Sequence, residues 1–174
     1  MEVTEVTEFK QKGMKLGRQT GSFFNGMMSS NKSMPEVGKG ATVLLWTDRH
    51  AYQVMEVSKD FKRVVVQQCK PKRIDNYGMG DCQIYDYSEL NGLNQVIVFR
   101  HGSWKFQNDV VTFTKEFNEL FDKMSREEQR KELDKLENGY GDWKLVEGKT
   151  HAKKEYSKVN ILWGVQDKYY DFSF

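Results

Sequence analysis

Short apolar stretches separated by polar turns run from residue 37 to residue 67, and this pattern constrains the fold more than any other part of the sequence. Ala41–Trp46 is apolar, and Tyr52–Val57 alternates polar with apolar residues at a period of two. Ser58–Phe61 has the composition of a turn, after which Arg63–Gln67 is again apolar. The pattern predicts a small antiparallel β-unit, interrupted by one polar cluster at Thr47–His50.

The same criteria predict further strands along the chain, at Gln83–Tyr87, Gln95–Arg100, Trp104–Phe106, Trp143–Val146 and Val159–Val165. Turns are expected at Asn91-Gly92 and His101–Ser103. The alternating end of the chain, Tyr169–Phe174, is expected to close the sheet.

Helical periodicity occurs twice. A short helix capped by Ser22 would carry an apolar face that usually packs on a core; this face comprises Phe23, Phe24, Met27 and Met28. A second apolar stripe has amphipathic spacing; it comprises Phe113, Phe117, Leu120, Phe121 and Met124. Ser125–Glu128 is a capping box that begins another helix, which ends near Asn138-Gly139.

Together these patterns predict one mainly β (α+β) domain: a small SH3-like barrel or rolled antiparallel sheet with a two-helix insertion at about residues 112–139. An open α+β sheet is the alternative. Residues 1–36 are expected to form a peripheral segment with a short helix, and residues 37–174 the β-rich domain.

Composition excludes several classes of protein. The chain has 174 residues, enough to bury a core, and its net charge of +2 is too small to indicate a polyanion partner by itself. Two cysteines, Cys69 and Cys82, are too few for a disulfide scaffold and are expected as free thiols. The sequence has neither an apolar run of membrane-spanning length nor a signal-peptide core. We therefore expect a cytoplasmic protein without a membrane partner.

Five segments carry a family resemblance: PEVGKGAT at 35–42, WTDRHAYQVMEVS at 46–58, KRIDNYGMGDCQIYDY at 72–87, FRHGSWK at 99–105 and GVQDKYYDFSF at 164–174. In these segments the chain resembles a family of small uncharacterised proteins encoded by tailed phages and by mobile elements of gut bacteria. The resemblance covers most of residues 35–106 and 158–174. It implies a viral or mobile-element origin and action in the host bacterial cytosol. The family has no assigned activity from which a catalytic residue could be carried over to this chain.

The first candidate site is the cluster of Asp48, Arg49 and His50. A carboxylate near an imidazole can orient a general base or supply part of a metal site. Metal sites need three or four ligands, however, and His101 and His151 are isolated in the sequence. The alternative is a β-turn in which Asp48 accepts backbone amides and Arg49 pairs with an acid elsewhere.

The second candidate is the loop Arg73–Met79. Arg73 offers a fork of donors suited to phosphate, and Asn76 and Gly78 permit backbone conformations that point amides at an anion. The alternative is a turn with an ion pair between Arg73 and Asp75.

The sequence contains no dinucleotide-binding, P-loop or serine-hydrolase motif, so we expect no catalytic residue, no cofactor and no metal. We expect a non-catalytic binding protein for a nucleotide-type anion, either a small nucleotide signal of a host defence system or single-stranded nucleic acid. The expected ligand-binding residues are Asp48, Arg49, His50, Arg73, Asp75, Asn76 and Tyr77.

Two other functions are open. A protein–protein module, either a virion component or an inhibitor of a host protein, would leave the helix face at 23–28 or at 113–124 exposed. A metal-dependent hydrolase would use Asp48, His50 and Asp75. Homo-oligomers are compatible with each function.

Overall fold

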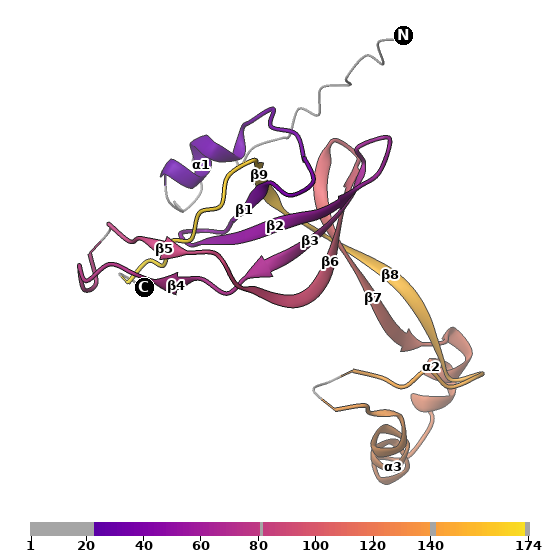
Figure 1. Ribbon diagram of the computed structural model, residues 1–174. Helices are drawn as coiled ribbons and strands as arrows, with labels where there is room; N and C mark the ends of the chain where they lie inside the picture. Colours follow the sequence, from indigo (N-terminus) through magenta and orange to yellow (C-terminus); the bar gives the residue numbers. More distant parts are fainter. Residues whose placement is uncertain (1–22, 81, 140–141, 173–174) are drawn as a thin grey trace. The chain divides into compact units, whose positions relative to one another are not determined.

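The computed structural model describes residues 23–80, 82–139 and 142–172, and it divides the chain into two compact units (Figure 1). Unit 1 comprises Met1–Phe106 and Ser157–Phe174, and unit 2 comprises Gln107–Tyr156. The predicted boundary at residue 36 stays a prediction.

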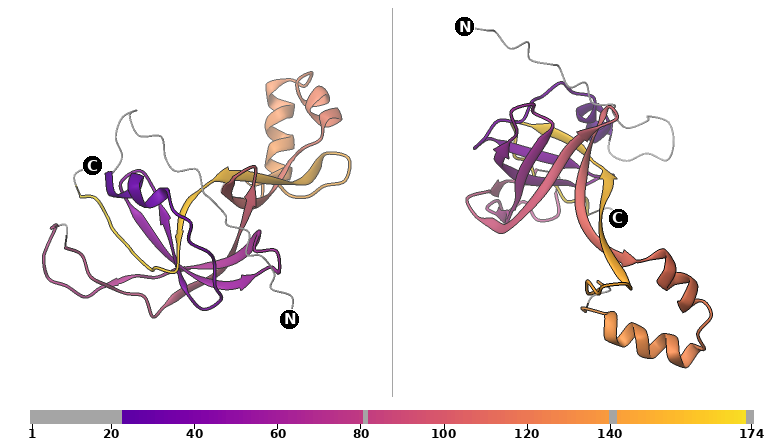
Figure 2. Two further views of the ribbon diagram at one scale, coloured as in Figure 1. Left: turned by 90° about the horizontal axis from the view of Figure 1, so that it is seen from above. Right: turned by 90° about the vertical axis from the view of Figure 1, so that its right-hand side faces the viewer.

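The principal element is a seven-stranded sheet with the order β8-β7-β6-β3-β2-β1-β9. Its strands are β1 (Gly40–Leu44), β2 (Arg49–Val57), β3 (Arg63–Cys69), β6 (Leu90–Arg100), β7 (Ser103–Phe113), β8 (Thr150–Lys158) and β9 (Asn160–Trp163). β4 (Lys72–Arg73) and β5 (Tyr85–Asp86) pair separately. Figure 2 shows that the strands of unit 1 form a curled antiparallel sheet, a half-barrel. The prediction of a mainly β fold with a rolled antiparallel sheet is confirmed.

In the described part of the chain, three short helices accompany the strands: α1 (Phe23–Ser29), α2 (Lys115–Phe121) and α3 (Arg126–Leu136). α2 and α3 lie between β7 and β8 in the chain. The sequence predicts a pair of helices in this region, at about residues 112–139. The capping box at the start of α3 is confirmed, because Ser125 Oγ accepts from the Glu128 amide and Glu128 Oε2 accepts from the Ser125 amide. Phe113 was assigned wrongly to the helix that precedes α3. It is the last residue of β7.

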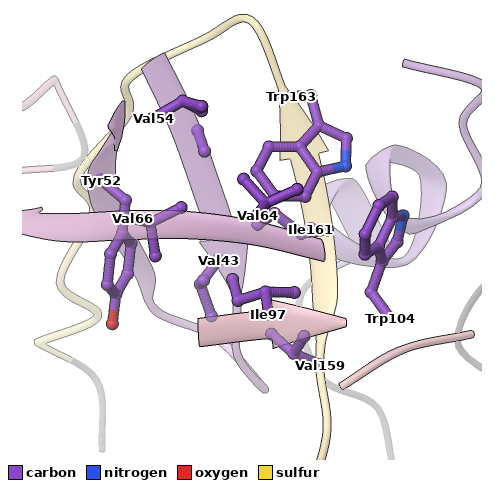
Figure 3. Close-up of a cluster of buried hydrophobic side chains, with 11 residues drawn as sticks. Val43, Tyr52, Val54, Val64, Val66, Ile97, Trp104, Val159, Ile161 and Trp163 are labelled. Carbon is purple, nitrogen blue, oxygen red and sulfur yellow. The ribbon is translucent and has the colours of Figure 1, made fainter. Parts of the chain in front are cut away.

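The core of unit 1 follows from the period-two alternation of its strands (Figure 3). Successive side chains of a strand point to opposite faces, so residues two apart enter the same core. Such pairs are Ala41 and Val43 on β1, Tyr52 and Val54 on β2, Val64 and Val66 on β3, and Ile161 and Trp163 on β9. The rings of Trp104 and Trp163 meet edge to face, with centroids 5.0 Å apart.

Two turn predictions have different outcomes. His101 and Gly102 both have positive φ (53° and 71°), which forms the tight hairpin expected between β6 and β7. Asn91-Gly92 is not a turn, because β6 continues through it. Gly92 adopts φ 76° there, and the register with β3 shifts between Gln67 and Cys69. The same left-handed residue thus produces a bulge instead of a reversal.

Three other assignments differ from the structure. Trp143–Val146 is not a strand but makes one isolated bridge, between Trp143 and Glu137. Up to residue 172, the end of the chain pairs with a strand through one isolated bridge, between Tyr169 and Arg49, and residues 173–174 lie outside the described residues. β8 was not predicted, because every residue after Thr150 is exposed and the strand therefore shows no alternation.

Cys69 and Cys82 are both free thiols, as predicted. Among the residues that the structure describes, no helix combines the length and apolar character needed to cross a membrane.

Gly40 is a position where the backbone of the C-terminal segment comes too close for a side chain. A Cβ atom there would lie 2.8 Å from the Gln166 amide nitrogen and 2.9 Å from the Val165 carbonyl carbon. We expect Gly40→Ala to lower the free energy of unfolding by about 1–3 kcal/mol, as overpacking does, measured by urea denaturation. Gly80→Ala is the control, because its Cβ would meet only the Tyr77 carbonyl oxygen, at 3.2 Å. Equal stability of Gly40→Ala and the wild type would contradict this close approach.

Candidate functional site

The cluster of Asp48, Arg49 and His50 lies where the β1–β2 turn enters β2. Arg49 Nε is 3.1 Å from Asp167 Oδ2, and the Arg49 guanidinium lies 4.8 Å from the centroid of the Tyr169 ring. Asp48 Oδ1 accepts a hydrogen bond from the Asp171 amide at 2.8 Å. These are the contacts that the turn interpretation of this cluster predicts.

His50 is half-buried beside Gln68, with 3.3 Å between His50 Nδ1 and Gln68 Nε2. Burial lowers the pKa of His50, the positive charge of Lys168 lowers it further, and Asp48 opposes both. These effects together favour the neutral form of the imidazole. Within residues 23–80, 82–139 and 142–172, no group of three or more His, Cys, Asp or Glu side chains is arranged to hold a metal ion.

In the second candidate loop, Arg73 and Asp75 form an ion pair, with Arg73 Nε donating to Asp75 Oδ2 at 2.8 Å. The Asp75 carboxylate also accepts from the Tyr77 amide at 2.9 Å and from the Ile84 amide at 2.7 Å. The hydrogen bond from Arg73, supported by both amides, holds the pKa of Asp75 well below its usual range. The Tyr77 amide, which the anion hypothesis would direct to a ligand, therefore already binds a carboxylate of the protein.

The remaining predicted residues of this loop are open to solvent. Asn76 is exposed, as is the Tyr77 side chain, and Gly78 has the left-handed φ of 63° that the sequence permits. A hollow of about 610 Å³ lies beside the loop and is lined by Ile74, Tyr85, Asp86, Tyr87, Ser88 and Gln166. This lining contains an aspartate and neither lysine nor arginine. The nucleotide-type ligand at these residues stays a prediction.

Residues 167–172 contact both clusters, which is a role that the sequence analysis missed. Besides the contacts of Asp167, Tyr169 and Asp171 with the first cluster, the Phe172 ring centroid lies 5.9 Å from the Arg73 guanidinium. Tyr170 exchanges two hydrogen bonds with the Gln83 side chain, at 2.7 and 3.0 Å. The sequence analysis offered Asp75 as a partner for Arg73 but did not identify Asp167 as the partner of Arg49.

The α1 face, defined as Phe23, Phe24 and Met27, is the other candidate. These side chains are 65%, 69% and 58% exposed, whereas Asn25, Gly26 and Ser29 are buried. Met28, the fourth residue of the predicted apolar side, is half-buried, and the expectation that this side packs on a core is wrong for the other three. The helix packs by its polar side, and the predicted cap Ser22 lies outside the described residues.

The buried Asn25 amide explains this orientation. Asn25 Nδ2 lies 3.1 Å from each of the Leu45, Thr47 and Asp48 carbonyl oxygens of the β1–β2 turn. An amide nitrogen carries two hydrogens, so at least one of them is shared between two carbonyls. These contacts add to a hydrogen bond within the turn itself, in which the Leu45 amide donates to the Asp48 carbonyl at 3.0 Å. The turn fixed in this way also presents Trp46, which is 55% exposed.

Comparisons with known proteins give no further guide: no protein-family model matches the chain, and neither a curated protein nor a solved structure matches it significantly.

Replacing Asn25 with aspartate tests the role of its amide. The change is nearly isosteric but puts a carboxylate against three carbonyl oxygens, so Asn25→Asp should lower the free energy of unfolding at neutral pH by about 1–3 kcal/mol or more. Chemical denaturation measures this loss. Asn76→Asp makes the same change at an exposed position and should be nearly neutral. A stable Asn25→Asp protein would show that the amide does not hold the turn.

The depressed pKa of Asp75 makes its contribution depend on pH. A carboxylate whose folded pKa is lowered stabilises the protein above its ordinary value of 3.8, and this stabilisation is lost as the pH falls through the folded pKa. Asp75→Asn should therefore have a lower melting temperature than the wild type at pH about 7, and the difference should shrink below pH about 3. The exposed Asp109→Asn serves as the matched control. A difference in melting temperature that is constant over this range would refute the assignment.

Proposed function

We propose that this chain is a non-catalytic binding module whose α1 face docks on a partner protein. The observation that carries the proposal is the inverted helix: two phenylalanines and a methionine lie in solvent while Asn25 and Ser29 are buried. An exposed helix face at 23–28 is the feature that distinguishes a protein–protein module from the other functions considered for this sequence.

The chemistry of the α1 face suits a protein partner. Aromatic residues and methionine are enriched in the cores of protein interfaces, where a few of them supply most of the binding energy. The hydrogen bonds of Asn25 hold α1 in place before binding, which reduces the ordering cost of association. Because the α1 face contains no charged residue, burial of apolar area is expected to drive association, with little dependence on salt.

The resemblance to phage and mobile-element proteins suggests the source of this partner. We infer that the protein acts in the host bacterial cytosol, as an inhibitor of a host protein or as a virion component. For the finer class of fold we propose an SH3-like roll, supported by the consecutive antiparallel strands β1, β2 and β3.

Site-specific photo-crosslinking in bacterial cells tests this proposal. A photoreactive phenylalanine analogue at position 24 should give an adduct with another protein, whereas the same analogue at Leu93, which is 68% exposed on β6, should not. Adducts that form equally at both positions, or only with a second copy of the chain, would contradict the proposal.

With the captured partner purified, Phe24→Asp should weaken binding by about 30-fold or more, as loss of an interface anchor does. Calorimetry measures the affinity, which should change little between about 50 and 500 mM salt. The melting temperature should not fall, because Phe24 is exposed. Leu93→Asp is the matched control and should bind like the wild type. An unchanged affinity of Phe24→Asp would remove the α1 face from the interface.

A further inference from the structure

We propose that unit 2 contains a second binding site, which takes a nucleotide: an aromatic base that carries phosphate. The site is a hollow of about 480 Å³, a volume typical of small-molecule sites. Its lining comes from the end of β7, the beginning of α2, the segment after α3, and β8. All of these residues belong to unit 2, so the site is complete within one compact unit.

One side of the hollow is aromatic. The rings of Phe113 and Trp143 lie 4.8 Å apart at 44°, and Phe113 also packs against Phe117 with centroids 5.3 Å apart. The backbone around Trp143 is fixed to α3 by the bridge to Glu137 and by a 2.7 Å hydrogen bond from the Lys144 amide to the Leu136 carbonyl. A partly buried indole held in this way offers a surface on which a base can stack.

The other side is cationic. Lys115, His151 and Lys153 line the hollow, and no carboxylate is among its lining residues. His151 and Lys153 are two residues apart on β8 and therefore project from the same face of the strand. Thr112 Oγ1 lies 3.5 Å from His151 Nε2. Two ammonium groups beside an imidazole are suited to a phosphate.

One of these cations has a competing partner. Lys153 Nζ lies 2.9 Å from Glu155 Oε1, but both side chains are about half exposed. An exposed pair of this kind contributes little stability, so a phosphate can take the place of the glutamate at small cost. The polar side chain of Asn118 completes the lining and can hydrogen-bond to a base or a sugar.

This hollow combines features that the one beside Arg73 lacks. The hollow in unit 1 is lined by tyrosines and Asp86 without a lysine or arginine, and both Arg49 and Arg73 face carboxylates. Of the two hollows described here, the one in unit 2 alone places aromatic rings beside lysines. The anion chemistry that the sequence suggested for residues 73–79 thus has a better geometric basis at a different place.

Calorimetric titration of the full-length chain tests the site, with AMP as the probe. AMP should bind, and a Lys115→Ala/Lys153→Ala double variant should weaken binding by about tenfold or more, because it removes two charge-assisted contacts. Lys154→Ala is the matched control: it removes one lysine from the opposite face of the same strand and should leave AMP affinity unchanged. Phe24→Asp should also leave it unchanged, which separates this site from the α1 face. Melting temperatures should be similar, since all three lysines are exposed.

Three further titrations show which part of the ligand the site recognises. Inorganic phosphate should bind at least about tenfold more weakly than AMP, and Trp143→Leu should reduce AMP affinity towards that of phosphate, because stacking is lost. Tighter binding of an eight-residue oligothymidylate than of AMP would assign the site to single-stranded nucleic acid, and the reverse order to a free nucleotide. The proposal is overturned if neither AMP nor the oligothymidylate binds, or if phosphate binds as tightly as AMP. It is also overturned if the double variant binds AMP like the wild type.

Discussion

The Asn25 amide and the carbonyls of the β1–β2 turn satisfy one another, and this contact determines which side of α1 meets the sheet. Burying three apolar side chains would stabilise the fold by about 1.5–3 kcal/mol each, but it would leave the amide outside and remove its hydrogen bonds to the Leu45 and Thr47 carbonyls. Each unsatisfied buried polar group costs about 1–3 kcal/mol. These two terms oppose each other, and in this structure the polar side of the helix is buried while its aromatic side is exposed.

Charge pairing has an equally local effect on the two arginine clusters. Arg49 faces Asp167 and Arg73 binds Asp75, so each of the two arginines that the sequence suggests for an anion lies against a carboxylate of the protein. In unit 2 the lysines and the histidine line a hollow that has no carboxylate in its lining, although Lys153 also pairs with the exposed Glu155. The spatial arrangement of charges, and not their number in the sequence, therefore distinguishes the two arginine clusters from the hollow in unit 2.

The sequence predicts those features that depend on neighbouring residues. The β-hairpins of residues 41–67, the turn at His101–Ser103 and the capping box of α3 are all local in this sense. Periodicity reveals that α1 has two sides but not which of them is buried, because that depends on carbonyls some 20 residues away. Gly92 shows the same limit, since its left-handed backbone fits a turn and a bulge equally well. The partner of Arg49 and the walls of the hollow in unit 2 come from segments far apart in the chain, for which one sequence contains no pairing signal.

The pairing of β1 with β9 joins segments on either side of unit 2, and Thr42 Oγ1 donates to a carbonyl 123 residues further along the chain. The hairpins of β1, β2 and β3 close short loops and can form early, whereas β9 can join β1 only after a long loop is closed. The entropy of that closure grows only with the logarithm of loop length, so doubling the intervening chain costs about 0.6 kcal/mol. The chain between β7 and β8, which contains α2 and α3, therefore lies where changes in length are thermodynamically inexpensive for the pairing of β9 with β1.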